Sequence, residues 1–268
     1  MSVRFQTCSV FFLMLASFNC VAQSIKLNLY TQDFPPLQFT LEGEPRGYVV
    51  DYVKKAIERA NESVPMKVEG VHFAPWKRAL KTVREKENTL LFSISRTQAR
   101  ENDYLWVAKV SPYKVGLFKL NGRNKIAITD IKHLSHSRVS APPGSSFQQL
   151  FQRYNFISVI PVSESKEAIR LLHSQRIDYA PMVEASAYYR LKEYGYNPEE
   201  FVKVTDIAEL CDDLWLVTSK STAPEVVKAL QRSFDDLEQM SYLEHLIQTY
   251  PKNSEIMNRY LHQKLSSE

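Results

Sequence analysis

The spacing of hydrophobic residues, which switches repeatedly between the period of a strand and that of a helix, is the strongest constraint on this fold. Ile25–Tyr30 alternates apolar and polar residues, as a half-buried strand does. From Val49 onward apolar residues recur at helical spacing, and Asp51 falls in the first turn, where the helix dipole favours an anion. Leu90–Ser95 has the composition of a buried strand. This alternation predicts an α/β fold with largely parallel sheets.

A second group of elements follows the same rhythm. The predicted order is a strand at 113–120, a strand at 138–141, a helix from Ser145, a strand at 157–162, a helix at 165–172 and a strand at 177–183. Ser145 followed by Gln148 is a capping-box pattern, and Ser165 is the expected N-cap of the next helix. The last quarter predicts a strand at 214–220 and a helix opened by Pro224, with helical spacing continuing to Pro251.

Few signals mark a domain junction. The chain contains only seven glycines and no low-complexity stretch, so no flexible linker is predicted. Any junction between domains must therefore be made from strands that cross.

The first 22 residues have the pattern of a cleaved secretory signal peptide. Arg4 precedes an apolar run at Cys8–Phe18, and small residues lead to a cut after Ala22. A membrane anchor is the alternative, but about eleven apolar residues fall short of the roughly twenty that span a bilayer. A lipoprotein at Cys20 is weaker, because the preceding residues lack a lipobox. Export would leave Cys211 alone, and one cysteine forms no internal disulfide.

Composition and missing motifs exclude several function classes. The 268 residues are 44% hydrophobic and 24% charged, which is ordinary for a globular protein, and the net charge of +4 is spread without a basic run. No nucleic-acid partner is therefore expected. Motifs for dinucleotides, P-loops, zinc proteases and nucleophile elbows are missing. His133 and His136 lack further ligands nearby, so no metal or cofactor is predicted.

A polar pattern lies at the end of the strand that begins at Leu90. Strand alternation predicts Ser93 and Ser95 on one face, with Phe92 and Ile94 on the other. If the strand ends near Ser95, the next turn carries Arg100 back over the same edge. A guanidinium can hold a carboxylate in a two-pronged grip, and hydroxyls can supply further hydrogen bonds. From spacing alone, a solvated arginine is the more common alternative.

This segment resembles the G-x-T-x-T-x-E-R signature of bacterial periplasmic solute-binding proteins of family 3, the polar amino-acid binders of ABC transporters. Ser93, Ser95, Thr97 and Arg100 stand at the Gly, first Thr, second Thr and Arg positions. The resemblance implies that Ser95 and Arg100 hold a ligand carboxylate. Ser93 and Asn88 both replace residues that are usually Gly in the family.

Other segments are similar in order and spacing. The loop "FPPLQF" resembles the family's ring-bearing loop, with Phe34 at the position that packs on the ligand, and "GYVVDYVKKAI" resembles its first helix start. "SPYKVGLF" resembles the first crossover strand, and "LWLVTSK" the closing segment. "APPGSSF" resembles the loop whose amides reach the ligand, so Ser145 and Ser146 are candidate binding residues; a helix N-terminus there suits an anion, or it is simply capped. Trp76 fits either ligand stacking or the core.

One departure concerns the ligand amine. The family's amino-acid binders carry an Asp at the position of Val183. Glu184 is the next candidate, but alternation would point it to the other face unless the strand has ended.

The resemblance implies a two-lobed periplasmic-binding-protein fold of type II, each lobe a mostly parallel sheet flanked by helices, joined by two crossover strands. The expected division is a signal peptide at 1–22, lobe one at 23–112 and 212–268, and lobe two at 113–211. The implied function is periplasmic capture of a small carboxylate, such as an amino acid, by a monomer that partners an ABC permease and is not an enzyme.

Two alternatives use the same fold. One is a cyclohexadienyl dehydratase-like enzyme with Glu184 as general acid. The other is a sensor module that acts through a separate receptor, since no signalling domain follows Glu268.

Overall fold

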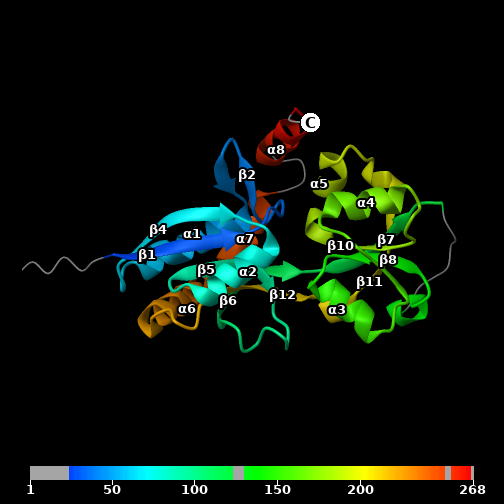
Figure 1. The fold of residues 1–268 in the computed structure, drawn as a ribbon. Coiled ribbons are helices and arrows are strands. Elements are labelled where there is room, and N and C mark those ends of the chain that lie inside the picture. Colours follow the sequence, from blue (N-terminus) through cyan, green and yellow to red (C-terminus); the bar gives the residue numbers. More distant parts are fainter. Residues whose placement is uncertain (1–23, 123–129, 251–254, 267–268) are drawn as a thin grey trace, which may run out of the picture.

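The protein is described by a computed structural model that covers residues 24–122, 130–250 and 255–266. Figure 1 shows two α/β lobes joined by extended strands, which confirms the predicted fold class. The predicted signal peptide lies outside the described residues. No helix in the described ranges is long and apolar enough to cross a membrane.

Lobe one is built on a five-stranded sheet in the order β4-β1-β5-β12-β6. Strand β1 (Ile25–Thr31) runs parallel to β4 (Met66–Phe73) and β5 (Thr89–Ser95). Strand β12 (Asp212–Thr218) is antiparallel to β5 and to β6 (Leu105–Tyr113), because it enters from the other lobe. The remaining elements are the hairpin β2 (Phe39–Leu41) and β3 (Glu44–Arg46), and the helices α1 (Tyr48–Ala60), α2 (Trp76–Glu85), α6 (Pro224–Gln239), α7 (Tyr242–Thr249) and α8 (Glu255–Ser266).

Lobe two has a three-stranded sheet in the order β10-β7-β11, formed by β10 (Ala180–Val183), β7 (Val115–Leu120) and β11 (Phe201–Asp206). Both strand pairs are antiparallel, so the prediction of a mostly parallel sheet was wrong for this sheet. A parallel pair, β8 (Arg138–Ala141) and β9 (Ser158–Pro161), lies beside it and is bridged to it through Val139 and Tyr179. Its helices are α3 (Ser146–Arg153), α4 (Ser165–His173) and α5 (Glu184–Glu193), with 3-10 turns at Ile131–Leu134, Pro198–Glu200 and Ala208–Leu210.

Two connections join the lobes. The chain leaves lobe one at Tyr113, enters β7 at Val115, and returns through Cys211 into β12. The Val115 amide donates to Cys211 Sγ at 3.4 Å, and the Ile207 amide donates to the Val115 carbonyl at 2.8 Å. The two connections are therefore tied together, and we propose that they form the hinge between lobe one (23–112 and 212–268) and lobe two (113–211).

The helix starts show which local signals were reliable. Ser145 caps α3, since its Oγ accepts from the Gln148 amide, and Pro224 opens α6, both as predicted. Ser165 is the first residue of α4 rather than its N-cap, which is Glu164, so that prediction was wrong by one position. The predicted helical spacing toward Pro251 is interrupted at Ser241, whose φ of 50° is left-handed and separates α6 from α7.

Gly47 sets the entry into α1. It has φ 119°, and a Cβ there would lie 2.3 Å from the Leu37 carbonyl oxygen. That oxygen accepts from the Val49 amide at 2.9 Å, so it cannot move away without breaking the start of the helix. Only glycine fits this close approach.

We predict that Gly47→Ala destabilises the fold by about 3 kcal/mol or more, because it combines backbone strain with a backbone clash. Gly43→Ala is the matched control: its φ is 82° but nothing lies within 4 Å of an added Cβ, so about 1 kcal/mol is expected. Guanidinium unfolding curves measure both, and equal losses would contradict the role given to Gly47.

Candidate functional site

The end of β5 contains a bulge at Ser93. Trp215 of β12 pairs with Ile94 while Leu216 pairs with Phe92, so Ser93 is left out of the register, and its φ is 64°. Phe92 and Ile94 consequently enter different hydrophobic clusters, and the prediction that they share a face was wrong. Glycine adopts this left-handed conformation more readily than serine does.

Ser93 supports the loop that carries Phe34. The Ser93 hydroxyl donates to Gln38 Oε1 at 2.8 Å, and the Gln38 side chain is fully buried. The backbones of Gln38 and Phe34 exchange two hydrogen bonds, of 2.7 and 3.0 Å. The bulge therefore helps to position the loop with the half-buried Phe34. The spacing of residues in the sequence did not predict this link between Ser93 and Phe34.

Arg100 lies in the turn after β5 and is 8% exposed. Its guanidinium donates to the Ser95 carbonyl at 3.1 Å and, across the lobes, to the Gly144 carbonyl at 3.5 Å. Among the described residues no carboxylate forms an ion pair with it. Burial lowers the pKa of Arg100 from its ordinary value, so the folded protein holds this charge at a cost.

Trp76 covers the same guanidinium. Its ring centroid lies 5.7 Å from Arg100 Cζ, and the ring also packs against the cluster that contains Leu91 and Ile94. As the first residue of α2, after Pro75, it is held by the helix start. Trp76 is therefore partly a core residue, and its ring also meets the Arg100 cation, while stacking on a ligand stays a prediction.

Tyr113 lies beside Ser95 and Arg100, although no sequence pattern singled it out. Burial raises the pKa of its hydroxyl, an effect that a hydrogen bond with the Ser95 side chain partly offsets. It is therefore a neutral group at the mouth of the first crossover. In the sequence, Tyr113 is marked only by its position at the end of the strand from which the chain leaves lobe one.

Lobe two contributes the start of α3. Gln148 Oε1 accepts from the Gly144 amide at 2.8 Å, and Ser145 Oγ accepts from the Gln148 amide at 3.2 Å. The amides of Ser146 and Phe147 occupy first-turn positions that a helix leaves unpaired. The bond from Arg100 to the Gly144 carbonyl joins the cation of lobe one to the residue that precedes the α3 N-cap.

Glu184 is placed differently. The strand has ended at Val183, and Glu184 is the first residue of α5. Its carboxylate forms an ion pair with Lys203 at 2.7 Å, and its amide donates to the Lys114 carbonyl in the crossover. The structure thus brings Ser95, Arg100, Trp76 and the 144–146 loop together, while Glu184 has its own cationic partner.

Metal ligation finds no support in the described ranges, where no three His, Cys, Asp or Glu side chains come together.

The sequence profile of the family described as bacterial extracellular solute-binding proteins, family 3, matches residues 28–253. This chain belongs to that family, and a ligand-binding role follows from it. Comparison with curated protein sequences gives no match.

Solved structures share the fold at low sequence identity. A histidine kinase sensor domain similar to periplasmic binding proteins is 17% identical, with a TM-score of 0.71 over 85% of this chain and 95% of that one. A protein of glutathione import through GshT and the cystine importer TcyBC of Streptococcus mutans has 16% identity and the same score and coverages. An ancestral arginine-binding protein bound to arginine has 16% identity and a TM-score of 0.69, over 84% and 97%.

We predict that Ser93→Gly is less destabilising than Ser93→Ala by about 1 kcal/mol, because both lose the bond to Gln38 but only Gly relieves the positive φ. Ser95, in the same strand without a positive φ, is the control, and there Gly should be worse than Ala. Thermal unfolding of the four variants measures their stabilities. If Ala is more stable than Gly at both Ser93 and Ser95, the result would argue against the bulge.

Proposed function

We propose that this chain is an exported binding protein that captures a small carboxylate-bearing ligand between its lobes and delivers it to an ABC transporter in the inner membrane. Family membership supports the binding role. Among structures of the same fold, one is a substrate-binding protein of an amino acid ABC transporter and another belongs to a cystine and glutathione import system. Periplasmic location and a monomeric state belong to this proposal.

The buried guanidinium of Arg100, which forms no ion pair with any residue that the structure describes, carries the proposal. A buried charge is costly unless it is paired, and the groups that now bond Arg100 are neutral carbonyls. A ligand carboxylate would supply the missing anion in the bidentate geometry that arginine prefers. The Ser95 hydroxyl and the first-turn amides of α3 would complete its hydrogen bonds, and Trp76 and Phe34 would flank it.

Closure follows from the same arrangement. Arg100 and Ser95 belong to lobe one and the α3 start to lobe two, so one anion contacts both only when the lobes are together. A ligand shifts the hinge equilibrium only through this differential affinity.

The ligand class remains broader than α-amino acids. Val183 offers no anionic partner for an ammonium group, and Glu184 is engaged by Lys203. We therefore extend the proposal to carboxylates with or without an adjacent amine.

The enzyme alternative is less well supported. A general acid must present a proton to the substrate, whereas Glu184 is held in an ion pair beside the crossover. The sensor alternative draws on the histidine kinase sensor domain that shares the fold, and it keeps the same ligand chemistry.

We predict that Arg100→Ala abolishes detectable carboxylate binding, a loss of about 2–5 kcal/mol or more as for truncating a buried charge pair, which is roughly 30- to 4000-fold in affinity. Ligands would first be found by thermal shift of the wild type against amino acids, their des-amino analogues and short peptides. Calorimetry would then compare wild type and variant with each hit.

Arg96→Ala is the matched control. Arg96 lies four residues earlier and is already paired with Glu101, so its loss should leave affinity unchanged. Unchanged affinity in Arg100→Ala would refute the clamp. Hits that lack a carboxylate would refute the ligand class.

A further inference from the structure

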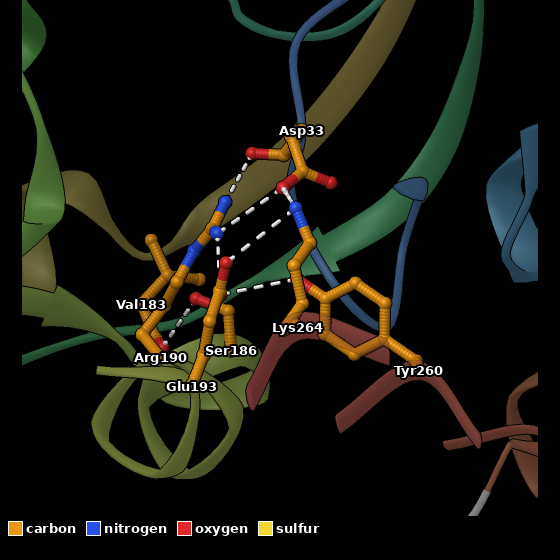
Figure 2. Close-up of polar contacts among 7 residues, drawn as sticks. All are labelled: Asp33, Val183, Ser186, Arg190, Glu193, Tyr260 and Lys264. Carbon is orange, nitrogen blue, oxygen red and sulfur yellow. Dashed lines mark hydrogen bonds and ion pairs between the residues drawn. The ribbon is translucent and has the colours of Figure 1, made fainter. Parts of the chain in front are cut away.

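A second polar contact crosses between the lobes at α5 and α8. Figure 2 shows Arg190 and Glu193 of α5 pointing toward Asp33, in the loop after β1, and toward Tyr260 and Lys264 of α8. In Figure 1, α8 and α5 are labelled near the top of the view and α3 lies below them. None of the bonds in this contact involves Arg100 or Gly144, although Asp33 directly precedes Phe34 of the proposed ligand site.

Helix α8 is anchored to lobe one. Met257 and Tyr260 are fully buried, and the Tyr260 ring packs edge-on against Phe39 at 4.8 Å between centroids. Gln263 accepts from the Glu42 amide at 2.8 Å in the turn of the β2-β3 hairpin. Helix α8 therefore belongs to lobe one, and a bond between α8 and lobe two is a bond between the lobes.

The bonds that cross between the lobes are charge-assisted. Arg190 Nη1 lies 3.3 Å from Asp33 Oδ2, and Arg190 Nη2 donates to the Asp33 carbonyl. The Tyr260 hydroxyl donates to Glu193 Oε2 at 3.0 Å, and Lys264 Nζ lies 3.7 Å from Glu193 Oε1. Two anions and two cations balance in this cluster.

Each lobe keeps a partner of its own. Arg190 also pairs with Glu193 at 2.8 Å within α5, and Lys264 pairs with Asp33 at 3.5 Å within lobe one. Separation of the lobes would therefore leave two neutral pairs rather than isolated charges. This makes the contact reversible, because neither half has to expose an uncompensated buried ion.

We propose that Asp33, Arg190, Glu193, Tyr260 and Lys264 form an interlobe latch that favours the closed arrangement independently of the ligand. Its bonds exist only when α5 lies against α8 and the β1 loop, so they bias the hinge toward closure. The latch adds to the energy that the ligand supplies and sets how far the lobes open without it. The inference depends on the hinge and not on the identity of the ligand.

The double variant Asp33→Asn/Lys264→Met tests the latch. It removes one anion and one cation, so net charge is unchanged and the Arg190–Glu193 pair is kept. Small-angle X-ray scattering of ligand-free protein, refolded from guanidinium to remove copurified ligand, should give a larger radius of gyration than for wild type. The wild-type value should match that calculated from the structure.

Two further variants serve as a control and as a second test. Arg138→Met removes an ion pair of 2.7 Å with Asp178 that lies within lobe two, and it should leave the radius unchanged. Tyr260→Phe removes only the hydroxyl that bonds Glu193 and should enlarge the radius partially; it decides the question if the double variant fails to fold. An unchanged radius in folded latch variants, or a wild type already more extended than the structure, would overturn the proposal.

Discussion

The buried guanidinium of Arg100 is the interaction on which the arrangement of this protein depends. It lies between a turn of lobe one and a carbonyl of lobe two, stacked on Trp76, and no carboxylate in the described residues balances it. A folded chain holds such a charge at a cost in stability, because burial disfavours the ionised form. A bound ligand anion would offset that cost, so the buried charge is consistent with a binding role.

Several unusual backbone positions serve the elements around this charge. The bulge at Ser93 bonds Gln38 and so places the loop with Phe34, while Gly47 lets the same loop approach the start of α1. Gly144, which directly precedes the N-cap of α3, has a left-handed φ of 77°, and its carbonyl oxygen accepts a hydrogen bond from Arg100. Left-handed backbone positions thus occur in the strand end before Arg100 and in the loop that accepts its bond, as is common at binding sites.

The proposed latch and the proposed clamp would both stabilise the closed arrangement of the lobes. The proposed clamp would gain its energy from the ligand, whereas the proposed latch at Arg190 and Asp33 would use only groups of the protein. A latch that was too strong would keep the lobes closed and slow ligand entry, which is consistent with each half keeping a partner when the lobes separate. Affinity would then reflect both the clamp contacts and the population of the closed state.

Sequence patterns predicted what depends on near neighbours. The alternation of β1, the amphipathic α1, the Ser145 cap and the start of α6 at Pro224 all depend on nearby residues, and they were predicted. The bulge at Ser93 was missed because it depends on the register with β12, more than a hundred residues away. Helix α5 escaped notice because it buries Ser186, Arg190 and Glu193, which blurs its hydrophobic period, and its partner Asp33 is 157 residues distant. Clusters of this kind are defined only by the fold.

The most direct test of the central claim is the stability of Arg100→Met in ligand-free protein, refolded from guanidinium and compared with wild type by equilibrium unfolding. If Arg100 is a charge held for a ligand, an apolar side chain of similar length should leave the free energy of unfolding unchanged or raise it by about 1–4 kcal/mol, as for other buried charges replaced by hydrophobic residues. A loss of about 3–5 kcal/mol, typical of breaking a buried pair, would mean that Arg100 is already satisfied within the fold and would contradict the account.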